Sequence, residues 1–448
     1  MSDLDLSALE IGRRIAAGKA DPRDLVREAF ARIAECDRDH SIFVRLLEAR
    51  AGAEAQAAYQ RARSGALRSP LDGVPLAWKD NIDIAGAPTE AGSRLLTGRV
   101  SNADAPVVEV TTRAGLIAIG KTNMVELAYS GLGYNPHTGT PRNPFDDVLA
   151  RLPGGSSSGS GIAVARHLAP LAIGTDTGGS VRIPAAWNNL VGLKTTAGRI
   201  GTIGLVPLSP SLDTIGPIAR DVADAAALFE ILCTEPHIDL GAAMPGNLRL
   251  IGLEGPVLGA VEPDTRTTIS GAIDRLAGAG MRIERRSLRS IEAAAAVQSP
   301  AAAESFALWG DLVAAQPGVA FALVEERVIA SGAITASQHI NAKARLAALT
   351  RLFTQETAGF DAVLMPTVAM RAPPIAEVEA SAEAYRAANV KALSLPSLAN
   401  RLGLCAITVP AGFAGAPLLP VGLTIVGRPF DERRMLQIAA AVERTLDS

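Results

Sequence analysis

Three residues of this chain could together perform acyl-transfer chemistry without a histidine: Lys79, Ser156 and Ser180. They lie in three short segments, with the sequences PLAWKDN (75–81), GGSSSGSG (154–161) and GTDTGGSVRIPA (174–185). Burial of a lysine disfavours its charged form and lowers its pKa toward neutrality, so that it can act as a base toward a serine hydroxyl. A serine activated in this way attacks the carbonyl of an amide or an ester. The three segments therefore predict a hydrolase whose base is a lysine.

The glycines that precede Ser180 add a second chemical element. Gly178 and Gly179 allow the backbone to turn tightly after Thr177, so that successive N–H groups can point at one spot. Such an array stabilises the negative oxygen of a tetrahedral intermediate, which makes Ser180 the predicted nucleophile. Taken singly, each segment has a plainer interpretation: a glycine turn capped by a serine, a flexible serine loop, or a lysine that is the first solvated residue after a strand.

The composition limits what else the chain can be. Its 448 residues, 48% of them hydrophobic, suffice for a large buried core, and a net charge of -3 favours neither nucleic acid nor an anionic membrane as a partner. The five histidines are scattered and no G-K-[ST] phosphate loop is present, so we expect no metal and no cofactor. Three cysteines far apart in the sequence and an acidic N-terminus without signal-peptide character predict a reduced, cytoplasmic protein.

Short apolar runs alternate with helical patterns from residue 74 onward, which predicts an α/β fold. Runs with the length and composition of buried strands occupy 74–78, 116–119, 168–173, 190–193, 248–253, 363–365, 406–409 and 421–426. The helical patterns between them place helices on both faces of a single large mixed β-sheet. Two helices that begin at Ser7 and Asp21, and a third over about 46–61, precede this region.

We expect a single domain over 1–448 with four parts. Residues 1–65 form an N-terminal helical flank, and 66–234 form the catalytic core that contains the motifs. Residues 235–360 form a variable, largely helical region, and 361–448 return to the sheet. A helical region inserted into one core is simpler than two independent domains, because short strands resume near residue 361.

The order and spacing of the motifs resemble the amidase signature family of serine hydrolases. The family patterns GVPLAxKDN, PGGSSxGS and GTDTGGSxRxPA match this chain at Gly73–Asn81, Pro153–Ser160 and Gly174–Ala185. Ser156 precedes Ser180 by 24 positions, which is the spacing of the family pattern. The resemblance covers nearly the whole chain and is weakest over 235–360, where family members differ.

The resemblance implies a catalytic triad in which Lys79 is the base, Ser156 is the bridge and Ser180 is the nucleophile. Lys79 takes a proton from Ser156, Ser156 takes one from Ser180, and an acyl-enzyme forms before water releases the acid. By the same resemblance, a cis peptide bond is expected before Ser156. The expected oxyanion donors are the backbone N–H groups of Thr177, Gly178, Gly179 and Ser180, and the expected supporting residues are Asp176, Arg182 and Gly155.

The substrate is expected to be a small to medium apolar, aryl or carbamate-like amide, with esters hydrolysed as a side activity. The reason is that no basic or acidic cluster in the sequence implies a charged acyl group. The expected partners are a small-molecule amide, no nucleic acid and no membrane, and the N-terminal helices are compatible with a homodimer. Candidate residues of the substrate pocket, for each of which core packing is the alternative, are Met124, Tyr129, Leu132, Tyr134, Phe306 and Trp309.

Two other functions stay open. One is the glutaminase (A) subunit of a tRNA-dependent amidotransferase, although that branch of the family commonly has a glutamine where this chain has Ile183. The other is a non-catalytic binding member of the family, against which the presence of all three triad residues argues. The chain also departs from the family pattern at Ser158, where many members have a glycine, and a side chain this small should not disturb the triad.

Overall fold

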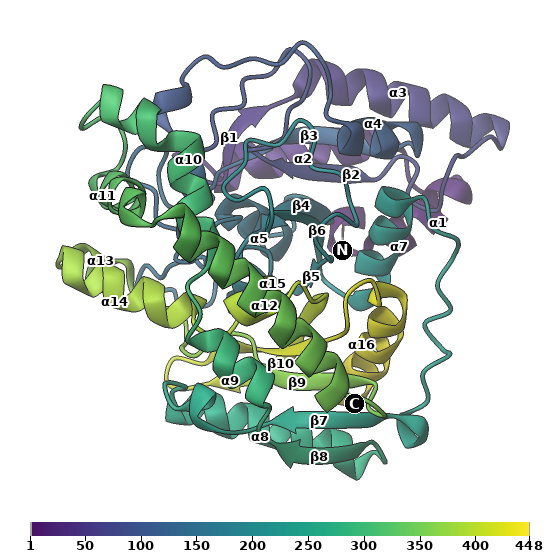
Figure 1. Ribbon diagram of the computed structural model, residues 1–448. Coiled ribbons are helices and arrows are strands. Elements are labelled where there is room, and N and C mark those ends of the chain that lie inside the picture. The colour runs from purple at the N-terminus through teal and green to yellow at the C-terminus, as the bar shows by residue number, and fades with distance from the viewer. Residues whose placement is uncertain (1, 448) are drawn as a thin grey trace.

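A computed structural model describes residues 2–447 and places the strands of this range in one eleven-stranded mixed sheet. The strand order is β1-β3-β2-β4-β6-β5-β10-β11-β9-β7-β8, from the upper part of Figure 1 to its foot. The strands are β1 (Phe43–Leu46), β2 (Pro75–Lys79), β3 (Ile117–Thr122), β4 (Leu171–Asp176), β5 (Val191–Lys194), β6 (Thr214–Ala219), β7 (Arg249–Leu253), β8 (Arg282–Arg286), β9 (Ala362–Pro366), β10 (Ala406–Ala414) and β11 (Leu419–Val426). The predicted single mixed sheet is confirmed.

The parallel pairing of β2 with β4 determines where the chemical residues meet. Leu76 pairs with Leu171 and Trp78 with Ile173, so the two strands end at the same edge of the sheet. Every residue of β2 and of β4 is buried, which explains why both strands are continuous apolar runs rather than alternating ones. Lys79, the last residue of β2, therefore lies beside the end of β4.

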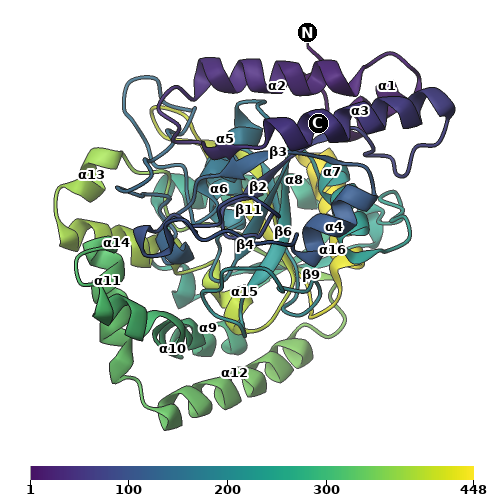
Figure 2. The same ribbon diagram turned by 90° about the horizontal axis from the view of Figure 1, so that it is seen from above.

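Helices cover the sheet on both faces (Figures 1 and 2). They are α1 (Ala8–Ala16), α2 (Pro22–Cys36), α3 (Glu48–Ser64), α4 (Pro106–Arg113), α5 (Ser158–Ala165), α6 (Arg182–Trp187), α7 (Val222–Cys233), α8 (Pro263–Gly278), α9 (Arg289–Ala295), α10 (Pro300–Ala315), α11 (Ala322–Ala330), α12 (Ala336–Glu356), α13 (Ile375–Glu379), α14 (Ala382–Leu393), α15 (Ser397–Arg401) and α16 (Glu432–Asp447). Figure 2 shows α2 and α3 along one side of the molecule and α12 along the opposite side. None of the helices within residues 2–447 combines the length and the apolar composition that a membrane span requires.

The N-terminal flank begins where the sequence predicts it. The Ser7 side chain accepts a hydrogen bond from the backbone N–H of Glu10 at the start of α1, and Asp21 accepts one from Arg23 at the start of α2. Both side chains satisfy N–H groups that have no partner within their helix. Apolar residues of α1 and α2, such as Ile11 and Leu25, are buried in the main core.

The region 235–360 is not only helical, because it also contributes β7 and β8. These strands pair in parallel with each other, and β7 also pairs with β9, so they extend the same sheet. We propose that the chain folds as one domain for this reason. The helices α9 to α12 lie beside the sheet, and α10 and α11 pack through Val313, Val324 and Val328 on a short segment that follows β3. This packing forms one wall of the cavity described below.

Candidate active site

Lys79 is fully buried at the end of β2 and is surrounded by hydroxyl groups. Its Nζ donates hydrogen bonds to Ser156 Oγ at 2.7 Å and to Thr175 Oγ1 at 2.7 Å, with the Thr175 carbonyl oxygen at 3.4 Å. Burial lowers the pKa of Lys79 to about 7, and the negative charges of Asp176 and Asp213 oppose this shift. The amine is therefore poised between its charged and neutral forms near neutral pH, as the sequence predicts for a lysine base.

Ser156 follows Gly154 and Gly155 and lies just before the start of α5. The peptide bond between Gly155 and Ser156 is cis, as the family resemblance predicts. The N–H of Gly155 donates to the carbonyl oxygen of Gly131 at 2.8 Å, and a Cβ added to Gly155 would lie 2.5 Å from the nitrogen of Gly133. Only glycine fits at position 155, because the loop around Gly131 passes so close to it.

Ser180 lies between β4 and α6 and lines a cavity. Its residue is 4% exposed, and its carbonyl oxygen accepts a hydrogen bond from the N–H of Ser157 at 3.2 Å. This bond ties the two serine segments together. Within the described residues, no hydrogen bond joins the hydroxyls of Ser156 and Ser180. Catalytic hydrogen bonds are often long before substrate binds, so this geometry is compatible with the predicted relay.

Asp176 organises the loop that carries the predicted oxyanion donors. Its carboxylate accepts two hydrogen bonds from the Arg182 guanidinium at 3.0 Å each and one from the N–H of Gly179 at 2.8 Å. Burial acts to raise the pKa of Asp176, but Arg182 outweighs it and holds this pKa well below its usual range. Asp176 and Arg182 thus lie where the sequence analysis places them, in support of the loop.

One of the four predicted oxyanion donors is turned away from the cavity. The N–H of Gly179 bonds to Asp176, so it cannot also hold an oxyanion in this arrangement. The N–H groups of Thr177, Gly178 and Ser180 have no acceptor among residues 2–447, and all three residues line the cavity. The φ of Gly179 is +124°, a backbone conformation that other residues avoid, and this turn directs its N–H toward Asp176.

The structure adds site residues that the sequence analysis did not single out. Thr175 Oγ1 accepts hydrogen bonds from Lys79 and from Asn81 Nδ2, the latter at 3.1 Å. Asp213 accepts a hydrogen bond of 2.5 Å from the Thr177 hydroxyl, and burial raises the pKa of Asp213 to about 6. Asp213 lies in the segment SLDTIGP and Thr175 directly precedes Asp176. Both residues lie within motifs of the sequence, and this position is the feature that could have indicated them. The sequence does not show which atoms their side chains contact.

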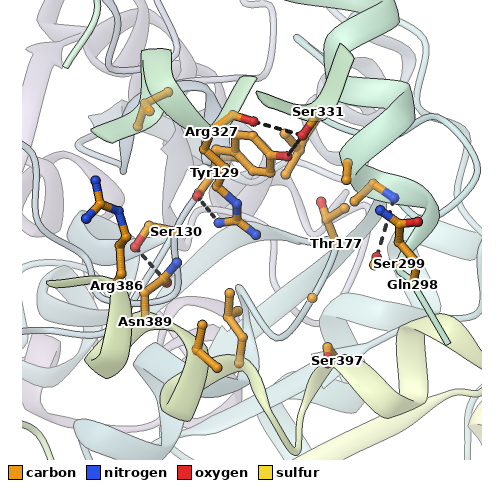
Figure 3. A pocket seen from close by; sticks show the side chains of 18 of the residues that line it. Tyr129, Ser130, Thr177, Gln298, Ser299, Arg327, Ser331, Arg386, Asn389 and Ser397 are labelled. Carbon is orange, nitrogen blue, oxygen red and sulfur yellow. Dashed lines mark hydrogen bonds between the residues drawn. The ribbon is translucent and has the colours of Figure 1, made fainter. Parts of the chain in front are cut away.

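The cavity beside Ser180 has a volume of about 750 Å³ and is drawn in Figure 3. Thr177, Gly178 and Ser180 form part of its wall, and side chains from α10, α11 and α14 form much of the rest. Its size exceeds what a small amide such as acetamide needs, and it falls within the range of cavities that bind drug-sized molecules.

Of the pocket residues predicted from the sequence, only Tyr129 lines the cavity formed by residues 2–447. Within the described residues, Met124 and Trp309 belong to the apolar cluster that joins α10 and α11 to the segment after β3, and Leu132 and Tyr134 belong to a neighbouring cluster. Phe306 packs over Gly310 and Gly332, where an added Cβ would lie 2.6 or 2.7 Å from its ring. Core packing, the alternative for each aromatic residue, is what the structure shows for Trp309 and Tyr134, whereas Phe306 is half-buried and lies outside the apolar clusters of the described residues.

The cavity instead carries polar side chains from the helical region. Arg327 of α11 donates from Nη1 to the carbonyl oxygen of Tyr129 at 2.7 Å and lies 4.0 Å from the centre of the Tyr129 ring. Among residues 2–447, no carboxylate lies within ion-pairing distance of Arg327, whereas Arg386 pairs with Glu326. An arginine without an acidic partner in a cavity is an attractive position for a ligand anion.

Potential metal ligands do not gather anywhere in the described part of the chain. Groups of three or more His, Cys, Asp or Glu side chains suited to hold a metal ion are absent from residues 2–447. Cys36, Cys233 and Cys405 are free thiols there.

Comparison with known proteins places the chain in a family. The model of the family described as Amidase matches residues 24–436. The chain belongs to the amidase family. It is therefore a hydrolase that acts on amide bonds, and the resemblance noted from its motifs is confirmed. The Glutamyl-tRNA(Gln) amidotransferase (A) subunit of Symbiobacterium thermophilum is 34% identical over 98% of this chain and 96% of that protein.

Two further comparisons concern a different enzyme and a solved structure. The 2-amino-5-chloromuconic acid deaminase of Comamonas testosteroni is 37% identical over 84% of this chain and 82% of that protein. A solved structure described only as an amidase is 31% identical, covers 98% of this chain and 100% of its own, and superimposes with a TM-score of 0.87. This likeness confirms the amidase signature fold.

The comparisons overturn the prediction about partners. A small-molecule amide without nucleic acid was expected, but relatives that align over nearly the whole chain are named as subunits of an amidotransferase for glutamyl-tRNA(Gln). The prediction used overall charge and the single position Ile183. Neither is decisive, because an enzyme subunit recognises its partners through local surfaces rather than through its net charge.

Proposed function

We propose that the amidase hydrolyses its substrate through a relay from Ser180 to Ser156 to Lys79. The observation that carries this proposal is the buried Lys79 amine, which lies 2.7 Å from Ser156 Oγ and has a pKa of about 7. In its neutral form the amine accepts the Ser156 proton while Ser156 accepts the Ser180 proton. A lysine can act in this way only where burial keeps a large fraction of it uncharged.

The reaction that follows consumes only the amide and one molecule of water. Ser180 Oγ bonds to the amide carbon, and the electron pair of the carbonyl moves to its oxygen. The N–H groups of Thr177, Gly178 and Ser180 would stabilise that negative oxygen. The carbon–nitrogen bond breaks as the relay returns the proton to the leaving nitrogen, which departs as ammonia or an amine. Water then attacks the acyl-enzyme, gives its proton to the relay and releases the acid.

The position of Arg327 favours a substrate that carries a carboxylate in its acyl part. This guanidinium lines the cavity without an acidic partner, and guanidinium groups bind carboxylates strongly in sites that exclude water. The names of two relatives agree with this interpretation, since one concerns a muconic acid and the other glutamyl-tRNA. We therefore place an acid amide ahead of the apolar amide expected from the sequence, where no charged cluster was visible.

A second candidate function is that of the glutaminase component in a tRNA-dependent amidotransferase. The similarity to a component of such an enzyme extends over 98% of the chain, and glutamine is itself an amide whose acyl part carries a carboxylate. Ile183 is the residue that argues against this candidate. The cytoplasmic location and the homodimer expected from the sequence stay predictions.

The test is to incubate the purified protein with L-glutamine and with monoamides of dicarboxylic acids, and to measure ammonia release and intact protein mass. Wild-type protein should release ammonia and gain the mass of one acyl group, and Ser180→Ala should do neither while it keeps its thermal midpoint. Ammonia release by the variant at the wild-type rate would overturn Ser180 as the nucleophile. Glutamine hydrolysis that rises when a co-purifying second protein is added would favour the amidotransferase candidate.

A further inference from the structure

Asn389 carries an amide whose oxygen and nitrogen have different surroundings in the cavity wall. It lies on α14, and its Oδ1 accepts hydrogen bonds from the Ser130 hydroxyl at 3.0 Å and from the N–H of Gly131 at 2.9 Å. Because a backbone N–H can only donate, the atom that faces Gly131 must be the amide oxygen. The Asn389 nitrogen therefore points away from this loop. Figure 3 shows Asn389 and Ser130 together in the wall of the cavity.

The nitrogen of this amide has no partner in the protein. Within residues 2–447, Asn389 Nδ2 donates to no other group, and it is not among the fully buried polar atoms that lack a partner, so it keeps accessible surface. The residue as a whole is only 7% exposed and lines the cavity, so this surface faces the cavity. Its N–H groups are therefore available to a ligand, and the two hydrogen bonds to Oδ1 keep the amide from rotating.

The oxygen side of the amide is linked to the peptide that carries Ser156. The N–H of Gly131 donates to Asn389, and the carbonyl oxygen of Gly131 accepts the N–H of Gly155 at 2.8 Å. Gly155 directly precedes Ser156. Asn389 thus supports the loop that holds Ser156, and a substrate held by Nδ2 is positioned relative to the reacting groups. Support of this kind reduces the entropy that is lost when a ligand binds.

The spacing along α14 indicates which part of a substrate reaches Asn389. Leu393, four residues after Asn389, lies 3.7 Å from the position of a Cβ at Gly178, in the predicted oxyanion loop. Four residues advance about 6 Å along a helix axis. Since a hydrogen bond spans about 2.9 Å and carbon–carbon bonds about 1.5 Å each, an oxygen bound by Nδ2 belongs to a carbon roughly three bonds from the scissile carbonyl carbon.

A neutral carbonyl oxygen is the acceptor that suits this amide. The free end of Asn389 is uncharged and offers only N–H donors, so it selects an acceptor and offers nothing to a donor such as an ammonium group. A ketone or amide oxygen accepts from it without the large loss of hydration that a buried carboxylate suffers. A methylene group at the same place would leave the nitrogen cut off from water and without a partner.

We propose that Asn389 is a specificity-determining residue that selects acyl chains with a carbonyl oxygen about three bonds beyond the scissile carbon. Nδ2 donates a hydrogen bond to that oxygen, while Oδ1 keeps the amide turned toward the cavity. This inference rests on the proposed amide hydrolysis, and it concerns a different part of the substrate from the carboxylate assigned to Arg327.

The experiment uses pairs of primary amides that differ in one carbonyl group. One pair is the monoamide of heptanedioic acid and its analogue with a ketone at the central carbon. The other pair is heptanamide and its analogue with a ketone at the same carbon. Ammonia release gives kcat/KM for every amide. Wild-type protein should prefer the ketone in at least one pair by about 2- to 10-fold, the effect of one hydrogen bond between neutral groups.

Asn389→Asp distinguishes the two ends of the amide. The carboxylate keeps an oxygen toward Ser130 and Gly131 but replaces the N–H donor with a second oxygen, which repels a carbonyl oxygen. At about pH 8, where a carboxylate is ionised, this variant should lose or reverse the preference for the ketone. Asn389→Ala removes both ends, so it should lose the preference and should also lower kcat for all four amides, because Gly131 loses its acceptor.

Asn341→Asp is the matched control, because it makes the same chemical change at an exposed position of α12 outside the cavity. It should keep the wild-type preference for the ketone. If circular dichroism shows that Asn389→Asp does not fold, the preference of Asn389→Ala decides in its place.

The outcomes separate this inference from the proposed function. Wild-type hydrolysis without a preference for the ketone in either pair would overturn the role of Asn389 while amide hydrolysis stands. A preference that persists in Asn389→Asp, or an equal loss on both members of a pair that leaves their ratio unchanged, would show that Asn389 has only a structural role. Release of ammonia from none of the four amides by wild-type protein would instead overturn the proposed function itself.

Discussion

The hydroxyl of Thr175 lies as close to the Lys79 amine as the hydroxyl of Ser156 does, at 2.7 Å. Thr175 is near the end of β4, and the parallel pairing of β2 with β4 brings it beside Lys79. Its oxygen also accepts a hydrogen bond from Asn81 Nδ2, which fixes the oxygen as an acceptor for the lysine. Thr175 thus positions Lys79 and favours the charged form of the amine.

Removal of this hydroxyl should weaken catalysis and change its pH dependence. In Thr175→Val the amine loses an acceptor, so its orientation toward Ser156 relaxes and its pKa falls. We expect kcat/KM to drop by about tenfold, the effect of one buried hydrogen bond, with the acidic limb of the pH profile displaced to lower pH. Thr175→Ser, which keeps the hydroxyl, should stay near wild type in both respects. An unchanged pH profile in Thr175→Val would mean that Thr175 does not act on Lys79.

The activity of the wild-type protein should rise with pH through neutrality. The base of the relay is the neutral form of Lys79, and burial lowers its pKa to about 7. The fraction of active protein is therefore small at about pH 6, roughly one half near pH 7 and nearly complete at about pH 9. A profile of kcat/KM between about pH 5.5 and 9, recorded with the fold monitored by circular dichroism, checks this. A rate that falls steadily over this range in folded protein would contradict lysine as the base.

The buried pair of Asp176 and Arg182 should be essential for stability as well as for the loop. Both side chains are fully buried, so Arg182→Ala removes the ion-pair partner of a carboxylate that water does not reach. Loss of one partner of a buried ion pair costs about 3–5 kcal/mol of unfolding free energy. Urea unfolding at neutral pH measures this change.

The exposed pair of Arg113 and Glu109 on α4 provides the control, because its side chains remain 68% and 51% exposed. Arg113→Ala should leave the unfolding midpoint essentially unchanged, since exposed ion pairs contribute little. Comparable losses in the two variants would show that burial of the Asp176 pair does not matter. A stable Arg182→Ala protein would likewise contradict its structural role.

The motifs predicted which side chains lie close together, and the pattern of the chain predicted the sheet. Lys79 and Ser156 are in contact as expected, and the peptide before Ser156 is cis. The apolar run predicted over 74–78 corresponds to β2 at Pro75–Lys79, and the second predicted helix begins at Pro22 with Asp21 as its N-cap. These short motifs predict contacts correctly because the residues involved lie at the ends of neighbouring strands.

The aromatic residues of the pocket were mostly mispredicted for a physical reason. Phe306 and Trp309 have the residue types of a binding site, but residue type does not tell which face of a helix meets the cavity and which meets the core. Trp309 packs with α11, and its indole N–H donates to the carbonyl oxygen of Pro207 at 3.0 Å. Helix α10 therefore directs Trp309 into the apolar cluster shared with α11, and it directs Phe306 over Gly310 and Gly332 rather than into the cavity.

The sequence by itself determined the reaction type, because its three motifs together resemble the amidase signature family in their order and spacing. Only the tertiary structure decided what surrounds them. Arg327 is far from Ser180 in the sequence, and it lines the same cavity only because α11 packs on the segment that follows β3. The tertiary structure also decided that the Gly179 N–H bonds to Asp176 and that the Thr175 hydroxyl accepts from Lys79. These hydrogen bonds depend on which strands and loops lie next to each other in space.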